Sequence, residues 1–155
     1  MKKYFSLFLA LVALFVVSSC SDDDSDASRT DLLTSKSWVV TKYEVEVSGQ
    51  SIDLTEDYMD CEGDNVITFS KDGKYNQTAG TNTCNGDEES ETGTWALKNS
   101  DKTIVLTVDG DVVEIEIHSL SSSTLKVKQE SVEFDTNGDG VDDTEVPFYV
   151  TLSAQ

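Results

Sequence analysis

Hydrophobic and polar residues alternate along most of the chain after residue 36, which is the pattern of β-strands with one buried face. Residues 113–118 are the clearest example, because three aliphatic side chains alternate there with two glutamates and a histidine. Turn sequences such as Asp72-Gly73 and Asp109-Gly110 separate neighbouring segments. The pattern therefore predicts antiparallel β-structure. One helical turn over residues 30–34, capped by Thr30 or Asp31, precedes the first strand.

Eight segments carry this alternation. They are residues 38–47, 66–70, a short strand around Tyr75, and residues 92–98, 103–108, 113–118, 125–128 and 146–152. The first segment is predicted to present Val39, Tyr43, Val45 and Val47 on one face and Lys42, Glu44 and Glu46 on the other. The last is predicted to align Val146, Phe148, Val150 and Leu152. Such strands joined by short turns form an up-and-down meander.

Closing the meander into a barrel removes its two exposed edges. We therefore predict an all-β domain over residues 30–155, an eight-stranded antiparallel up-and-down barrel with a short N-terminal helical turn. The alternation changes parity before Val132, which predicts a bulge or break near Gln129. Pro147 within the last strand indicates an edge or a bulge. We expect Trp38 and Trp95 to belong to the core at a barrel end, although lining of a ligand cavity is the alternative.

The first 19 residues differ from the rest and have the layout of a secretory signal. Lys2 and Lys3 precede an apolar run over residues 4–17, which is too short to span a bilayer. The sequence Val17-Ser18-Ser19-Cys20 resembles the lipobox of bacterial lipoprotein precursors. This resemblance implies that Cys20 is diacylated and becomes the mature N-terminus, which anchors the protein to a membrane. The alternative is an ordinary secretory signal followed by a free cysteine.

Residues 20–29 are rich in serine and aspartate and show no apolar periodicity, so we expect a disordered, lipid-anchored tether. The run of aspartates resembles the acidic sorting signal of some gram-negative lipoproteins. It implies an outer-membrane lipoprotein that is exposed on the cell surface. The alternative is that the segment serves only as a spacer.

The charge balance excludes one class of partner. The chain has 30 acidic and 11 basic side chains, a formal net charge of −19. Nucleic acid is therefore excluded, because its binding depends on many basic contacts to phosphates. Anionic lipid headgroups are disfavoured for the same reason.

Cys61 and Cys84 form an even pair once Cys20 is assigned to lipid, and a disulfide is the default in an exported protein. Such a bridge stabilises the fold by roughly 3 kcal/mol in the chain-entropy model. The alternatives are a metal site, for which the chain has too few soft ligands, or a catalytic thiol.

The sharpest chemical signal is the acidic, glycine-containing segment over residues 135–143. Its oxygen ligands would fall at loop positions 1, 3, 5, 7 and 9, which are Asp135, Asn137, Asp139, the carbonyl of Val141, and Asp143. Position 12 is Val146, so the segment is not an EF-hand and instead resembles the Asp-x-Asn-x-Asp-Gly loops of extracellular calcium repeats. We predict a structural Ca²⁺ that orders the last hairpin. The alternative is a solvated acidic turn.

Signs of catalysis are lacking. His118 is the only histidine, and it falls on the outer face of its strand. The serines over residues 119–123 lack the context of a nucleophile elbow. The sequence has no phosphate-binding glycine loop or dinucleotide fingerprint. We therefore expect a protein that is not an enzyme.

Several short sequences, in order, resemble the bacterial lipocalin-like domain family of secreted lipoproteins, within the calycin group. They are residues 33–38, Cys61 with residues 64–69, residues 72–75, Cys84, residues 93–97, 117–120 and 124–125. The resemblance covers nearly all of residues 32–152. It implies a monomeric barrel that binds a small apolar or amphipathic molecule. The alternative is a filled barrel that serves as an accessory or interaction module of the outer membrane. Ile104, Leu106, Ile115 and Ile117 are large enough to fill a small barrel.

Overall fold

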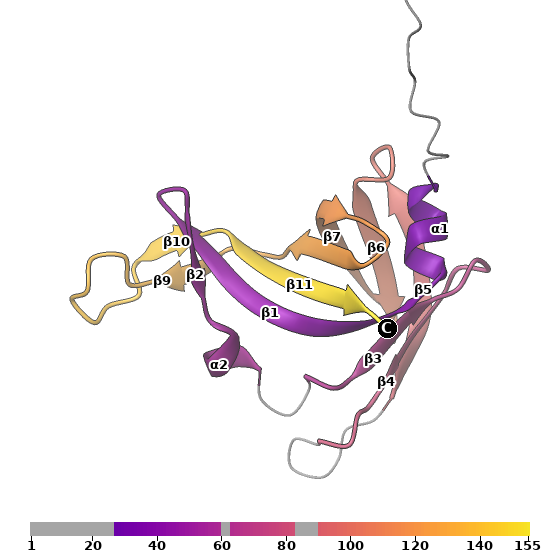
Figure 1. Ribbon diagram of the computed structural model, residues 1–155. Helices are drawn as coiled ribbons and strands as arrows, with labels where there is room; N and C mark the ends of the chain where they lie inside the picture. The colour runs from indigo at the N-terminus through magenta and orange to yellow at the C-terminus, as the bar shows by residue number, and fades with distance from the viewer. Residues whose placement is uncertain (1–26, 60–62, 83–89) are drawn as a thin grey trace, which may run out of the picture.

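A sheet closed on itself dominates the computed structural model, which describes residues 27–59, 63–82 and 90–155 (Figure 1). The strands are β1 (Ser37–Val47), β2 (Gln50–Asp53), β3 (Val66–Phe69), β4 (Lys74–Thr78), β5 (Glu91–Lys98), β6 (Thr103–Val108), β7 (Asp111–Leu120), β8 (Thr124–Lys128), β9 (Val132–Phe134), β10 (Thr144–Val146) and β11 (Phe148–Ala154). The helices are α1 (Arg29–Thr34) and α2 (Thr55–Tyr58). None of the helices in these residues is long and apolar enough to cross a membrane.

The barrel closes through β1, which pairs antiparallel with β3 on one side and with β11 on the other. Trp38 lies opposite Ile67 in the first ladder and opposite Ala154 in the second. The order around the described barrel is β1, β3, β4, β5, β6, β7, β8 and β11. This closure confirms the predicted eight-stranded, antiparallel, up-and-down barrel, and each predicted strand is present.

A bulge in β1 corrects the predicted faces of that strand. The register between β1 and β11 shifts between Val40 and Lys42, which leaves Thr41 as the extra residue. The Thr41 hydroxyl lies 3.1 Å from the Ser153 hydroxyl and donates to a β11 carbonyl at 3.2 Å. The parity of β1 changes at this point, so Val40 rather than Val39 joins Tyr43 on the inner face. The prediction for Val39 was wrong because uniform alternation was assumed.

The last part of the chain forms one long hairpin with an interruption. β8 pairs with β11 and β9 pairs with β10, and the Gln129 N–H donates to the Phe148 carbonyl between the two ladders at 3.0 Å. The predicted break near Gln129 is confirmed, because β8 ends at Lys128. Pro147 lies between β10 and β11, where its missing N–H costs no ladder hydrogen bond. The proline therefore does not prevent closure.

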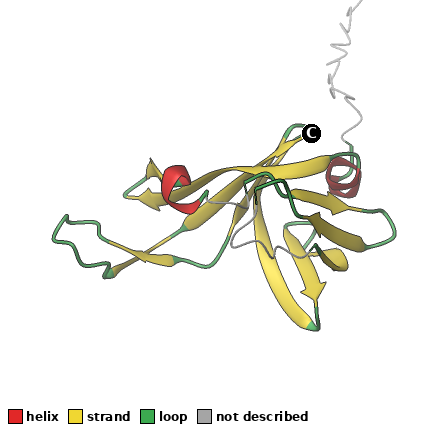
Figure 2. Ribbon diagram, turned by 90° about the horizontal axis from the view of Figure 1, so that it is seen from below, coloured by secondary structure: helices red, strands yellow, loops and turns green. Residues whose placement is uncertain are grey.

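The predicted helical turn before the first strand is present as α1, which lies across one end of the barrel (Figures 1 and 2). Its N-cap is Ser28 rather than Thr30 or Asp31, because the Ser28 hydroxyl accepts a hydrogen bond from the Asp31 N–H at 3.1 Å. The Arg29 guanidinium donates to the Asp101 carbonyl at 3.1 Å, which joins the helix to the β5–β6 turn. We call this end, with α1 across it, the closed end.

The interior of the closed end is filled by large side chains. Leu33 and Trp38 are completely buried. The Trp38 indole N–H donates to the Leu33 carbonyl at 3.0 Å, and that of Trp95 donates to the Ser70 carbonyl at 2.9 Å. Phe69 meets the Trp95 ring edge-on with 5.3 Å between centroids. Both tryptophans are therefore core residues of a barrel end, as predicted.

Four elements were not among those predicted, namely β2, α2 and the short pair β9 and β10. The turn between β1 and β2 has positive φ at Ser48 (51°) and Gly49 (78°), which suits a tight hairpin. All four residues of β2 are exposed. A strand without a buried face carries no alternation of hydrophobic and polar residues, so its sequence gives no signal.

Candidate functional site

The barrel interior contains a cavity of about 220 Å³. Its lining is mostly aliphatic and aromatic and includes no charged side chain. The lining residues are Val40, Tyr43, Ile67, Phe69, Tyr75, Gln77, Ile104, Leu106, Ile115, Leu125, Val127, Gln129, Val150 and Leu152. Alternation along seven strands, together with Gln129 beyond β8, brings these side chains to one interior space. The cavity is therefore an environment for an apolar group.

The four aliphatic residues named as barrel fillers divide into two groups. Ile104, Leu106 and Ile115 line the cavity, whereas Ile117 is buried in the core and does not line it. Trp38 and Trp95 also lie outside the cavity lining. The barrel is thus filled at the closed end and leaves space further along its axis.

Polar groups at the cavity wall come from two tyrosines, Tyr43 and Tyr75, and from two glutamines, Gln77 and Gln129. The Tyr75 hydroxyl donates to the Gln77 side-chain carbonyl at 3.0 Å. Burial, assisted by the negative charge of Glu91, raises the pKa of Tyr75 to about 12. The phenol therefore stays protonated and neutral at physiological pH. The cavity offers hydrogen bonds but no charge for a bound molecule. Sequence reasoning missed Gln77, although its two-residue spacing from Tyr75 placed it on the inner face.

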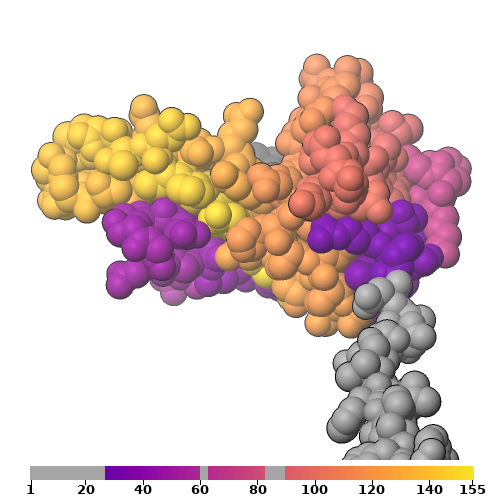
Figure 3. Space-filling view, turned by 90° about the horizontal axis from the view of Figure 1, so that it is seen from above, coloured from indigo at the N-terminus to yellow at the C-terminus, as the bar shows by residue number. Residues whose placement is uncertain are grey.

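A second, larger space of about 680 Å³ lies beside the cavity, and we call it the side groove. Its lining consists of Val112, Val113, Glu114, Ile115, Gln129, Glu130, Ser131, Val132 and Phe148. Ile115 and Gln129 line both spaces, so the cavity and the groove meet at these two residues. The space-filling view shows a hollow between the β6–β7 hairpin and the segment that leads from β8 to β9 (Figure 3).

The groove exists because the barrel wall is incomplete. Residues 111–115 of β7 pair with β6, but the ladder between β7 and β8 begins only at Glu116. Beyond Lys128 the chain turns into β9, which among the described strands pairs with β10. Val113, on the inner face of β7, consequently remains 53% exposed, and its outward-facing neighbour Val112 is 61% exposed. We call this end of the barrel the open end.

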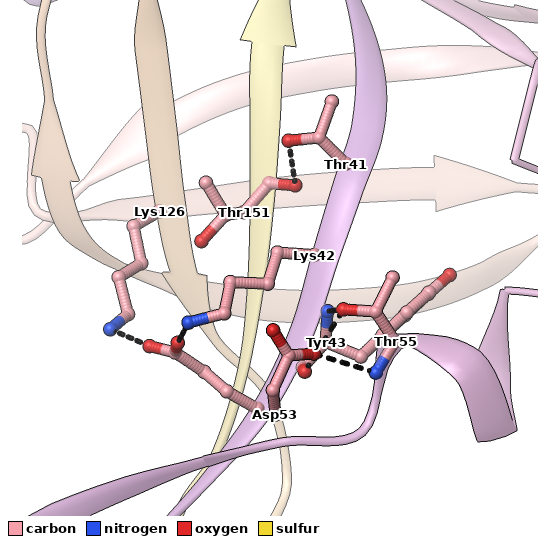
Figure 4. A network of polar contacts seen from close by, with 8 residues as sticks. Thr41, Lys42, Tyr43, Asp53, Thr55, Lys126 and Thr151 are labelled. Carbon is pink, nitrogen blue, oxygen red and sulfur yellow. Dashed lines mark hydrogen bonds and ion pairs between the residues drawn. The ribbon is translucent and has the colours of Figure 1, made fainter.

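A cluster of ion pairs lies on the outer surface of the barrel, on β1 and β8 (Figure 4). The Glu44 carboxylate pairs with Lys42 on its own strand and with Lys126 across β11. Lys126 also lies 4.6 Å from the centroid of the Tyr149 ring, against which His118 packs edge-on. Beside the cluster, Asp53 accepts a hydrogen bond from the Thr55 N–H at 2.9 Å. These contacts join β1, β8 and β11.

Glu44 faces outward as predicted, but it is not exposed to solvent. Its side chain is only 6% exposed, and the lysines Lys42 and Lys126 both pair with it. Burial alone would raise its pKa, but hydrogen bonds from Lys126, Lys42 and Ser51 outweigh this effect and lower the pKa to about 2. The carboxylate is therefore ionised and fully engaged at neutral pH. This arrangement suits a structural role. His118 is exposed, as predicted.

The acidic segment of residues 135–143 folds around its own backbone amides. The Asp135 carboxylate accepts hydrogen bonds from the N–H groups of Asn137 (3.1 Å), Gly138 (2.6 Å) and Gly140 (2.7 Å). These hydrogen bonds lower the pKa of Asp135, and the bond from the Gly140 N–H has the largest effect. Asn137 accepts from the Asp139 N–H, and Asp139 from the Val141 N–H, each at 2.9 Å.

The side chains at loop positions 1, 3 and 5 thus accept hydrogen bonds from the loop's own backbone, as they also do in a solvated turn. No group of three or more His, Cys, Asp or Glu side chains in the described residues is arranged to hold a metal ion. The calcium site stays a prediction.

The predicted lipidation and disulfide sites lie outside the described residues. Cys20 precedes residue 27, and Cys61 and Cys84 fall within 60–62 and 83–89. Both modifications therefore stay predictions.

Comparison with known proteins shows the family of this barrel. The sequence model of the lipocalin-like domain family matches residues 34–127, more than half of the chain. The chain therefore belongs to the lipocalin-like domain family.

Two solved structures resemble the barrel. One is a lipocalin-like protein from Bacteroides uniformis ATCC 8492, with 14% identity, a TM-score of 0.44, and coverage of 79% of this chain and 96% of that one. The other is a DUF4847 family protein from Bacteroides vulgatus ATCC 8482, with 13% identity, a TM-score of 0.49, and coverage of 79% and 94%. No curated protein matches the sequence.

Proposed function

We propose that this chain is a non-catalytic binding protein whose barrel holds one small apolar or amphipathic molecule. The observation that carries the proposal is the interior cavity of about 220 Å³ with an uncharged lining. Family membership supports it, because a lipocalin-like barrel is a suitable container for one small ligand. In the cavity wall the one titratable type of side chain is tyrosine, which favours binding over acid–base chemistry.

The size of the cavity limits its occupant. Water occupies about 30 Å³ in the liquid, so the cavity holds roughly seven groups of that size. Pockets for drug-sized molecules are larger, about 300 to 1,000 Å³. The proposed occupant is therefore a short alkyl chain or a small ring, alone or as the apolar end of a longer molecule.

The alternative is a filled barrel that acts as an accessory module of the outer membrane. Packing at the closed end, around Trp38 and Trp95, suits that alternative. The remaining cavity and its connection to the side groove favour ligand binding.

Attachment to the outer membrane through a lipid on Cys20 completes the proposal. The tether over residues 20–29 would join the barrel at α1, because this helix begins at Arg29. Since α1 lies across the closed end, the open end and its groove would face away from the attachment point (Figure 1). We propose a monomer exposed on the cell surface, with a Cys61–Cys84 disulfide and a structural Ca²⁺ in the loop of residues 135–143.

The experiment is a calorimetric titration of the purified protein with octyl glucoside, below its micelle concentration. We expect saturable binding of one molecule. Leu106→Trp places an indole in the cavity and should weaken binding by about tenfold or more, the effect of 1.4 kcal/mol. Thr107→Trp is the matched control, because the next residue on β6 points to the opposite face. Equal affinities for the two variants, or no saturable binding to the unsubstituted protein, would refute the proposal.

A further inference from the structure

We propose that the side groove receives the polar end of the bound molecule and selects a neutral or cationic headgroup over a carboxylate, sulfate or phosphate. This inference rests on the proposed function, since it concerns the same ligand. It assigns the apolar end to the cavity and the polar end to the gap between β7 and the β8–β9 segment.

The first step is the position of the groove relative to the cavity. Both spaces are lined by Ile115 and Gln129, so the cavity adjoins the groove at these two residues. The cavity is small, at about 220 Å³, whereas the groove measures about 680 Å³. A molecule with an alkyl chain and a larger headgroup therefore fits with the chain inside and the headgroup in the groove.

The second step is the hydrogen-bonding capacity of the groove wall. Residues 111–115 of β7 form a ladder with β6 and none with β8, so one edge of this segment lacks a strand partner in the described structure. An unpaired strand edge presents both N–H and C=O groups. Ser131 and the Gln129 amide add side-chain donors and acceptors. Such a wall binds hydroxyl or amide groups without requiring charge.

The third step is the charge of the groove. Glu114 and Glu130 line it, and the lining contains no lysine or arginine. The Lys98 ammonium lies 2.6 Å from the Glu114 carboxylate and is balanced by it. Glu130 has no salt bridge within the described residues and leaves one net negative charge. The chain as a whole carries −19, which further repels anions.

The charge at Glu130 therefore gives specificity through repulsion as well as attraction. An anionic headgroup in the groove would lie near an unbalanced carboxylate and in the negative field of the whole chain. A quaternary ammonium group would lie in a favourable field, and a sugar would depend on hydrogen bonds alone. The order of affinity expected for one alkyl chain is ammonium, then sugar, then sulfate.

The test uses three probes with the same octyl chain, namely octyltrimethylammonium, octyl glucoside and octyl sulfate. Each is titrated into the purified protein by calorimetry at low and at high ionic strength. We expect octyl sulfate to bind about tenfold more weakly than octyl glucoside, since like-charge juxtaposition costs more than 1.4 kcal/mol. The difference should shrink at high salt, because exposed charges are screened.

Two matched variants locate the selectivity. Glu130→Gln removes the unbalanced groove charge and should weaken octyltrimethylammonium binding about threefold, as for an exposed ion pair. Asp101→Asn makes the same change of charge in the β5–β6 turn at the closed end and should leave all three affinities unchanged. Melting temperatures verify that both variants, which alter exposed side chains, remain folded.

The outcomes separate this inference from the proposed function. Failure of all three probes to bind would refute the function itself. If octyl glucoside binds and octyl sulfate binds as tightly or more tightly, the headgroup selectivity is wrong while the cavity assignment stands. Equal effects of Glu130→Gln and Asp101→Asn would also overturn the inference, because selectivity would then come from overall charge rather than from the groove.

Discussion

The two ends of the barrel are built from the same strands but differ in how completely the strands surround their interior. At the closed end, Trp38 is completely buried and its indole N–H is bonded to the Leu33 carbonyl. At the open end, Val113 sits on the inner face of β7 and is 53% exposed. Alternation alone therefore does not bury a side chain. Burial also requires that the neighbouring strand continue alongside.

The difference originates at the end of β8. At the closed end, β8 pairs with both β7 and β11. After Lys128 the chain leaves β7 and continues toward β9, so β7 extends beyond its neighbour. A short interruption in one strand thereby converts a closed barrel into one with a lateral gap.

The largest expected effect concerns the packing of the closed end. Trp38→Ala removes a completely buried indole and its hydrogen bond, and should lower the free energy of unfolding by about 4 kcal/mol. Val112→Ala at the open end removes a side chain that is 61% exposed and should cost less than about 0.5 kcal/mol. Urea unfolding measures both. Similar costs at the two positions would show that the ends do not differ as described.

The next effect concerns the wall beside the gap, where the ion-pair cluster of Glu44, Lys42 and Lys126 joins β1 and β8 across β11. Glu44→Gln should destabilise the protein by about 2 kcal/mol, because it removes a buried carboxylate that two lysines share. Glu46→Gln, two residues further along β1 and exposed, is the matched control and should change little. Urea unfolding at pH 7 measures the free energy of unfolding of both variants. Equal losses in the two variants would show that the ion-pair cluster does not stabilise the contact between these strands.

The same carboxylate predicts a pH dependence with a definite sign. The pKa of Glu44 is about 2 in the folded protein, whereas the ordinary pKa of a glutamate is 4.5. As the pH falls, Glu44 therefore takes up a proton in the unfolded chain before it does so in the folded protein. The stabilisation that ionised Glu44 gives to the folded state is present above pH 4.5 and is lost between about pH 4.5 and pH 2. The Glu44→Gln variant should lack this part of the acid destabilisation. An unchanged difference in stability between the two proteins across that range would contradict the assignment.

The smallest expected effect concerns the loop of residues 135–143 beyond the open end. At an affinity of ~10⁻⁴ to 10⁻³ M, calcium at several millimolar should stabilise the fold by about 1 to 2 kcal/mol and raise its melting temperature. Asp139→Ala should abolish the rise. Asp142→Ala is the control within the same loop, since Asp142 is not a predicted ligand. No rise in the unsubstituted protein, or equal losses in both variants, would reject the site and leave the solvated turn.

How far the sequence predicts this structure depends on whether the determining contacts are local. Alternation within β6 and β7 correctly placed Leu106 and Ile115 on the inner face. The bulge at Thr41 was not predicted because it depends on the register with β11. The burial of Glu44 depends on Lys126, 82 positions away, which no pattern along β1 can reveal.

The candidate site was less predictable than the fold for the same reason. The side groove results from where the ladder between β7 and β8 begins, at Glu116, and strand registers are not encoded in a single segment. The break in the strand near Gln129 was correctly predicted. The position of Gln129 between the cavity and the side groove was not predictable, because it depends on how the strands close into a barrel. Gln77 could have been found, because a polar residue on an inward position suggests an interior that is not fully packed.

The central claim is that the barrel interior admits the apolar end of a ligand from the open end. Intermolecular nuclear Overhauser effects with octyl glucoside test it most directly. We predict contacts from the octyl chain to the Leu106 and Ile115 methyl groups, and from the sugar to the groove residues Val113 and Ser131. Contacts confined to the exposed surface, with none to Leu106 at saturation, would contradict the claim.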